Sequence, residues 1–425
     1  MKSTHIIIRL VILATLVIGS GMVSCSKMND LHDQYLQDGE QVYVGKPDSV
    51  RVYPGKERAL VRYWTSDPKA TKIVIYWNSR QDSLLIDIPD KQREEPVDVM
   101  ITGLAEQNHT FELVTMNAQM GNRSIPLQAT ERVYSVNFQE SLQNRRIRSA
   151  VRAGDPKTAE FVGNALTINW LGEVEHSIKV NLRYTNSANE EVSVLVSPSE
   201  SQTLITDYKE NLSYRTFFKP DTAAIDTFYT EIVNAGGQVE IPIAKPYADF
   251  SRPGIIPTAF NAKSLIWNKV AGDANQSFLF YIERSDVGTN KNRSVVFDLQ
   301  VTKKLTRFRQ WQRLGNGVEY ILQNARHFEI WGTNDATVNA AGDASFNGWT
   351  KLGSYEVIKP SSPASYPAAA AAGDEFVIDP AAPPVRYIRY VVLSTWDFPD
   401  PANQPSAGTQ HIGAIGELTF YGFEN

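Results

Sequence analysis

The chain has 425 residues, of which 42% are hydrophobic and 21% are charged, and its formal net charge is −5. This composition is typical of a soluble, core-forming protein of roughly two to four domains. It excludes a disordered, collagenous or multispanning chain. The weak acidity also argues against a nucleic-acid partner, because such binding needs a clustered basic face to meet phosphates.

The N-terminus has the order of an export signal. Lys2 and Arg9 precede an apolar run from Leu10 to Ile18, and small residues follow. A positive, apolar and then small-residue order is typical of exported proteins. The run is about half of the ~20 residues that span a bilayer, so it is too short for a stop-transfer helix.

Cys25 is the one cysteine of the sequence, so an intrachain disulfide and any metal site built from several thiolates are excluded. The segment Met22-Val23-Ser24-Cys25 resembles a bacterial lipoprotein signal, which implies that Cys25 is acylated after cleavage. We predict a signal peptide over 1–24 and a polar tether over 25–40, with the protein anchored to a membrane by lipid. The alternative is an ordinary secretory signal with a stray thiol.

Beyond residue 40, short alternating segments are broken by Gly, Pro, Asn and Asp, and no stretch keeps a helical period over four turns. This pattern predicts an all-β fold. Ala59–Trp64 aligns with Ala165–Trp170, and Ile101–Leu104 aligns with Ile205–Tyr208, at an offset of about one hundred residues. That offset is the size of a small β-sandwich.

The two copies resemble fibronectin type III domains, and we predict them over 41–140 and 141–241. In each copy an early tryptophan, Trp64 and then Trp170, is expected to face the core. Arg62 interrupts the alternation of the first copy, so we expect a bulge or a snorkelling side chain there. Pro242 and Pro246 then predict the end of a strand and a domain boundary.

The last part of the chain, over 248–425, carries a more specific set of strand-like segments. They are, in order, Ser294–Leu299, Leu305–Arg313, Phe328–Asp335, Trp349–Gly353, Val385–Val392 and Ile412–Gly422. This ordered set resembles a discoidin (coagulation-factor C-type) domain, which implies a jelly-roll β-sandwich. The Ala- and Pro-rich segment Pro360–Pro384 is predicted to be a surface loop.

The whole arrangement is similar to surface lipoproteins of Bacteroidota polysaccharide-utilisation systems. The resemblance implies a cell-envelope protein at the outer membrane that assists the capture or uptake of a polysaccharide.

No catalytic signature stands out in the sequence. The histidines are dispersed, and neither a Gly-x-Ser-x-Gly elbow nor a phosphate loop occurs. Neighbouring carboxylates such as Glu94 and Glu95 would point to opposite faces of a strand. We therefore predict a protein that is not an enzyme, with a hydrolase of degenerate signature as the less favoured alternative.

Sugar binding needs an aromatic ring for the C–H face of a pyranose and planar polar groups for its hydroxyls. Trp396 ends a predicted strand and opens a proline-stiffened polar loop, and with it we predict Asp397, Asn403 and Gln404 as ligand-binding residues. The alternative for Trp396 is a ring that caps the end of the sandwich.

Further candidate ligand residues lie elsewhere in the C-terminal domain. Trp311, which lies between two arginines, is a second aromatic candidate, with packing as the favoured alternative. Discoidin-like sugar modules also use an early loop, which implies Asn268 and Asp273 as ligand residues here, against a simple polar turn.

The same resemblance implies a structural Ca²⁺ held by the early loop and a late glutamate. Glu417 occupies that late position, although the early loop departs from the usual Asp-Gly-Asp pattern. The alternative is an ordinary hydrogen-bonding residue on a final strand. No other cofactor is expected.

Two functions thus follow from the sequence. The first is a non-catalytic lipoprotein that binds glycan through its C-terminal domain. The alternative is a structural or adhesion lipoprotein whose C-terminal domain binds an envelope protein.

Overall fold

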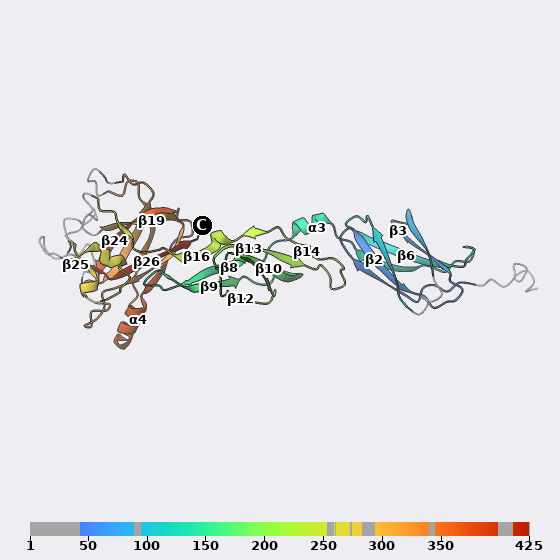
Figure 1. Cartoon of the computed structure of the whole chain (residues 1–425), viewed down its shortest axis with the longest axis horizontal. Coiled ribbons are helices and arrows are strands. Elements are labelled where there is room, and N and C mark those ends of the chain that lie inside the picture. Colours follow the sequence, from blue (N-terminus) through green and yellow to red (C-terminus); the bar gives the residue numbers. More distant parts are fainter. Residues whose placement is uncertain are drawn as a thin grey trace, which may run out of the picture. The chain divides into compact units, whose positions relative to one another are not determined.

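The computed structural model describes residues 43–88, 95–252, 259, 261–272, 274–282, 294–338, 340, 345–397 and 411–424. The fold is all-β, as predicted, with strands gathered into several sheets (Figure 1). None of the helices within these residues has the length and apolar character needed to cross a bilayer. The chain forms two compact units, one of residues 1–138 with Asp221–Asp226, and one of 139–220 with 227–425. The division falls in a short helix, α3 (Val136–Ser141).

The first unit holds a sandwich of two antiparallel sheets. One sheet has the order β1 (Ser49–Pro54), β2 (Arg58–Trp64) and β5 (Val97–Thr102). The other has the order β4 (Asp82–Asp87), β3 (Lys72–Trp77), β6 (Asn108–Met116) and β7 (Leu127–Arg132). Fully buried Val61 and Tyr63 of one sheet share a core with Ile75 and Phe111 of the other. The arrangement is consistent with a fibronectin type III-like sandwich.

The predicted alignment of the first copy is wrong by one residue. In β2, Ala59, Val61 and Tyr63 are buried, so Trp64 lies on the opposite face and is only half-buried. Arg62 faces outward without any bulge in the pairing of its strand, and its guanidinium binds the Asp98 carboxylate at 2.6 Å. Because side chains alternate along a strand, a one-residue shift exchanges the two faces. Tyr63, and not Trp64, is therefore the counterpart of Trp170.

The second unit begins with a second sandwich. One sheet contains β8 (Ile147–Gly154), β9 (Phe161–Trp170) and β12 (Gln202–Ile205). The other contains β10 (Ser177–Thr185), β11 (Glu191–Val196), β13 (Glu210–Phe218), β14 (Phe228–Tyr229) and β15 (Val233–Asn234). Trp170 is 5% exposed, as predicted for the core, and its indole meets Tyr214 edge-on at a centroid distance of 5.6 Å.

The first sheet of this sandwich continues into the C-terminal part of the chain. The strand β16 (Val239–Pro242) pairs in parallel with β8 and antiparallel with β26 (Glu417–Phe423), between which it lies in Figure 1. The resulting seven-stranded sheet has the order β12, β9, β8, β16, β26, β20 (Leu305–Trp311) and β23 (Asp374–Val377). The prediction that a strand ends at Pro242 is confirmed. The sheet nevertheless continues across β16 to β26. Pro242 does not prevent this pairing, because it is the last residue of the strand.

A five-stranded sheet faces the C-terminal half of the seven-stranded sheet. It has the order β17 (Ala248–Asp249), β19 (Ser294–Lys303), β24 (Val385–Thr395), β21 (Ala325–Thr333) and β22 (Thr350–Glu356), while β18 (Phe278–Ile282) pairs with β25 (His411–Ile415). Fully buried Phe297 and Phe328 of the five-stranded sheet share one core with Phe308 and Phe420 of the seven-stranded sheet. The predicted strand segments of this region all coincide with strands, and the discoidin resemblance stays a prediction.

The segment Pro360–Pro384 is more ordered than the predicted surface loop. It contains the short helix α4 (Tyr366–Ala372), seen in Figure 1, and the edge strand β23. Gly373 ends α4 with φ +78° and ψ 153°, a conformation that is open to glycine. A Cβ at this position would lie 2.7 Å from the Trp311 indole. Because Gly373 has no side chain, the end of α4 can pack closely against the Trp311 ring.

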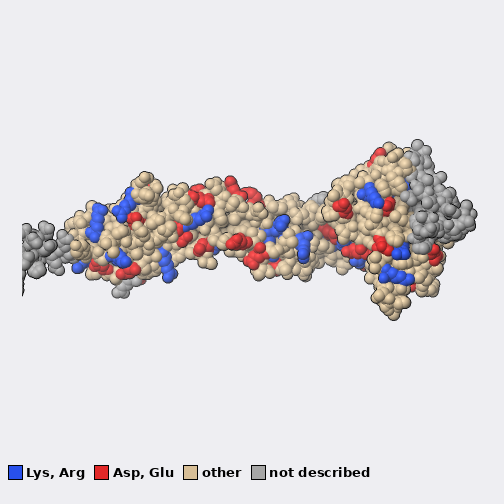
Figure 2. Space-filling view, turned by 180° about the vertical axis from the view of Figure 1, so that it is seen from behind, with Lys and Arg blue, Asp and Glu red and all other residues tan. Residues whose placement is uncertain are grey.

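The charged side chains of both signs are mixed over the surface. Figure 2 shows Lys and Arg interspersed with Asp and Glu on the face that it presents. Many of them form ion pairs, such as Arg80 with Glu112 and Arg326 with Glu356.

We predict that Gly373→Ala destabilises the second unit by about 1–3 kcal/mol. Alanine is strained at this positive φ, and its methyl group would clash with the Trp311 ring. Thermal unfolding followed by near-ultraviolet circular dichroism measures the change in midpoint. Gly172→Ala is the matched control, since a Cβ there meets no atom within 4 Å. Equal midpoints for the two variants would contradict the account.

Candidate functional site

Trp396 lies immediately after β24, where the sequence placed it. Its ring is half-buried and packs against the C-terminal core, and its backbone N–H donates to the Asn324 carbonyl at 3.3 Å. Asp397 is exposed, and its backbone N–H donates to the Leu322 carbonyl at 3.0 Å. Two adjacent backbone hydrogen bonds thus hold these residues to the segment that precedes β21.

Trp396 belongs to a cluster of aromatic rings and cations. The buried Tyr320 ring lies 5.4 Å from the Tyr366 ring and 6.5 Å from the Trp396 ring, measured between centroids. The Lys359 ammonium lies 4.9 Å from the centroid of Tyr366 and 5.2 Å from that of Trp396. The Arg326 guanidinium lies 5.0 Å from the same indole. We name Tyr320, Lys359, Tyr366 and Trp396 the aromatic–lysine cluster.

The cations of this site differ in their partners. Arg326 also binds the Glu356 carboxylate at 3.0 Å. Lys359 is half-buried, and within the described residues it has no carboxylate partner. A lysine ammonium has three donors, and aromatic faces satisfy its charge without accepting all of them. Lys359 therefore keeps donors for a ligand.

Tyr320, Lys359 and Tyr366 were not among the site residues predicted from the sequence. Tyr366 and Lys359 border or lie in the segment that was predicted to be a plain loop. Tyr366 begins α4, whose following Pro367 favours the first helical turn. An aromatic residue next to a helix-starting proline was the available signal, but no local pattern relates it to Tyr320 or Trp396, which lie far away along the chain.

A half-buried carboxyl group, that of Asp374, interacts with Tyr320 of the cluster. Asp374, the first residue of β23, accepts a hydrogen bond from the Tyr320 hydroxyl, and its Oδ2 atom is buried with no partner among the described residues. Burial raises the pKa of Asp374 to about 6, and the hydrogen bond from Tyr320 opposes that shift. Burial is likewise the main cause that raises the pKa of Tyr320.

Trp311 has no role at the surface, so its prediction as a ligand residue is wrong. The ring is 1% exposed, and its Nε1 donates to the Ala371 carbonyl of α4 at 3.1 Å. A ring enclosed in this way cannot cover the face of a sugar. From β20, the Trp311 ring instead holds α4, the helix that carries Tyr366, through this hydrogen bond.

Asn268 lies in a polar turn after a short 3-10 helix, Lys263–Trp267. Its Nδ2 donates to the Gln276 Oε1 at 3.0 Å, and its Oδ1 accepts from the Val270 N–H at 2.9 Å. The amide thus closes its own loop, as in the alternative of a polar turn.

Glu417, proposed as a calcium ligand, forms a buried ion pair instead. Its Oε1 contacts the Lys245 ammonium, both side chains have no exposed surface, and its Oε2 accepts from the Val270 N–H at 3.1 Å. Burial raises the pKa of Glu417 and lowers that of Lys245, and the attraction between the two charges opposes both shifts. Since protein donors engage both carboxylate oxygens, this residue does not fit a calcium site.

Four predicted residues fall outside the described part of the chain. They are Cys25, Asp273, Asn403 and Gln404. Their roles stay predictions.

We predict that removing one partner of the buried pair is far worse than removing both. Lys245→Met or Glu417→Leu alone leaves an uncompensated buried charge and should cost about 3–5 kcal/mol. The double variant should recover most of that loss, since neither charge remains. Unfolding midpoints of the four proteins measure the effect, and single losses under about 1 kcal/mol would contradict it.

We also predict that Asp374 lowers the stability of the folded chain in a pH-dependent way. Because its folded-state pKa is about 6, above the ordinary value of 3.8, its favourable contribution is complete at low pH and is lost as the pH rises through about 6. Asp374→Asn should therefore gain in unfolding midpoint over the unmodified chain between pH 4 and pH 7. A difference in midpoint that stays constant over this pH range would refute the assignment.

Residues 25–228 match a family described as a domain of unknown function, and residues 270–422 match a second family with the same description. No curated protein matches the sequence. Among solved structures, a SusE-like protein is similar over 90% of this chain and 98% of its own length, with 16% identity and a TM-score of 0.33. A segment of two fibronectin type III domains from chicken tenascin matches over 44% of this chain and 99% of its own length, with 13% identity and a TM-score of 0.19.

Proposed function

We propose that this chain is a non-catalytic, lipid-anchored protein of the bacterial cell envelope that binds glycan through its C-terminal domain. Its role is accessory, in the capture or uptake of a polysaccharide at the outer membrane. Cys25 within its lipoprotein-like signal supports the anchor.

The single observation that carries glycan binding is the aromatic–lysine cluster. The half-buried Lys359 ammonium lies over two rings, at 4.9 Å and 5.2 Å, and the exposed Asp397 carboxylate follows Trp396 directly. A ring supports the C–H face of a pyranose, the ammonium donates to hydroxyl oxygens, and the carboxylate accepts from hydroxyl groups. These are complementary groups for a polyhydroxylated ligand at the end of a rigid sandwich.

The alternative is a structural lipoprotein that uses the same end to bind an envelope protein. Aromatic rings and cations also serve protein interfaces, so the composition of the cluster agrees with both functions. The two differ in what the cluster retains, a polysaccharide or a protein.

We predict that the full-length protein is retarded in native gels that contain its polysaccharide, and that Trp396→Ala and Lys359→Ala reduce the retardation by about tenfold or more in apparent affinity. The full chain is used because β16 pairs strands on both sides of residue 242, so cutting there would break the sheet.

The matched controls are Trp64→Ala, at a half-buried tryptophan of the first unit, and Lys46→Ala, at an exposed lysine of the same unit. Both should keep full retardation. No retardation by any polysaccharide, together with copurification of an envelope protein that depends on Trp396, would favour the alternative. Released reducing sugar would refute the non-catalytic assignment.

A further inference from the structure

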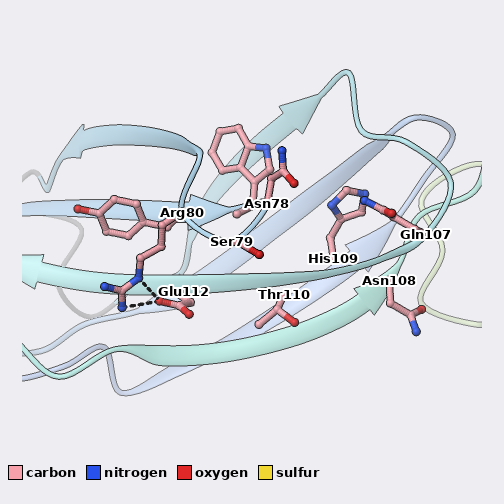
Figure 3. A pocket seen from close by; sticks show the side chains of 10 residues that line it. Asn78, Ser79, Arg80, Gln107, Asn108, His109, Thr110 and Glu112 are labelled. Carbon is pink, nitrogen blue, oxygen red and sulfur yellow. Dashed lines mark hydrogen bonds and ion pairs between the residues drawn. The ribbon is translucent and has the colours of Figure 1, made fainter.

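The first sandwich holds a polar groove of about 380 Å³ beside the end of β3 and the start of β6. The turn between β3 and β4 supplies Asn78 and Ser79, and the start of β6 supplies Gln107, Asn108 and Thr110 (Figure 3). Sequence analysis assigned no ligand residue to this domain.

The turn that borders the groove has an unusual backbone. Asn78, Ser79 and Arg80 are three consecutive non-glycine residues with positive φ, at 51°, 53° and 64°. Each such residue costs free energy, and such strain gathers at functional sites where the surrounding contacts maintain it. Here the Asn78 Nδ2 donates to the Asp82 carboxylate at 3.2 Å, and the Gln81 N–H donates to the Asn78 carbonyl at 3.0 Å.

The charges of the groove cancel each other. Arg80 donates through Nε to the Glu112 carboxylate at 2.6 Å, which the dashed lines of Figure 3 mark, and its guanidinium lies 5.4 Å from the Tyr76 ring centroid. The other oxygen of Glu112 accepts from the Gln128 amide at 3.0 Å. A ligand in this groove therefore meets little net charge. Glu112 is the one carboxylate of the lining, so the groove lacks the pair of carboxylates that glycoside hydrolysis uses.

The uncharged groups of the groove remain open to a ligand. Gln107 and Asn108 are exposed, and within the described part of the chain their side-chain amides have no hydrogen-bond partner. Each amide offers two donors and one acceptor. Trp77 also lines the groove. Its half-buried ring packs on the core of the sandwich, and this packing holds the ring in place.

We infer that this groove is a second ligand site, which binds an uncharged saccharide through the Trp77 ring and the amides of Gln107 and Asn108. An aromatic ring, free amides and a balanced charge are the groups that recognise neutral sugar rings with hydroxyls on their edges. The first sandwich then has a ligand-binding role of its own. This inference goes beyond the proposed function, which concerns another domain.

The test uses the full-length protein on an array of neutral gluco-, manno-, xylo- and galacto-oligosaccharides with oligogalacturonides as acidic probes. We expect a neutral oligosaccharide to bind, and we expect Gln107→Ala, Asn108→Ala and Trp77→Ala each to weaken its binding by about tenfold or more. Gln119→Ala is the matched control, because Gln119 is an exposed amide in the β6–β7 turn of the same sandwich. It should leave binding unchanged.

Trp77→Ala removes core contacts, so the two exposed amide variants decide the test if that protein fails to fold. The inference is overturned if the unmodified chain binds no neutral probe, if it binds acidic probes alone, or if Gln107→Ala and Asn108→Ala bind as the control does. Trp396→Ala separates the two sites. Loss in Trp396→Ala alone would refute the groove and keep the proposed function, whereas loss in the groove variants alone would do the reverse.

Discussion

The pairing of β16 on both of its edges is the constraint on which the second unit depends. Its residues Val239 and Glu240 pair with β8, and Glu240 to Pro242 pair with β26, so backbone hydrogen bonds join two sandwiches into one seven-stranded sheet. A sheet joined in this way cannot be separated without exposing backbone donors and acceptors. The Thr306 hydroxyl and the Arg307 guanidinium, which both donate to Glu240, reinforce the joint from β20. The second sandwich and the C-terminal part of the chain therefore share one continuous sheet.

Directly beyond β16, the chain buries the ion pair of Lys245 and Glu417. The Lys245 ammonium also donates to the Lys157 carbonyl at 2.9 Å, and the neighbouring Tyr247 hydroxyl accepts from the Phe420 N–H at 3.0 Å. Burial removes both charges from water, so the ion pair adds little stability compared with apolar packing. Loss of one partner, however, would leave the other charge buried without compensation. The geometry ties the segment after β16, the turn at Val270 and the start of β26 to one arrangement. That role takes the place of the calcium that the resemblance implied.

The two proposed ligand sites both combine an aromatic ring with hydrogen-bonding groups, but they differ in charge. In the groove of the first sandwich, Arg80 and Glu112 neutralise each other, and the amides of Gln107 and Asn108 line the same groove as Trp77. In the aromatic–lysine cluster, the Lys359 ammonium lies over the rings of Tyr366 and Trp396 and has no carboxylate partner among the described residues. Both place a ring and hydrogen-bonding groups on loops that rigid sheets support, which limits the entropy lost on binding.

The sequence alone determined the all-β class, the repeat of about one hundred residues and the strands of the C-terminal domain, because alternation and turn residues are local signals. It did not determine the register of β2, where Tyr63 and the adjacent Trp64 are both aromatic and packing against the opposite sheet chose between them. It also missed Lys359 beside Trp396 and Lys245 beside Glu417, the latter pair 172 residues apart. Such contacts arise when distant segments close over a shared core, and no local pattern encodes them, so only the tertiary structure decided which side chains form the sites.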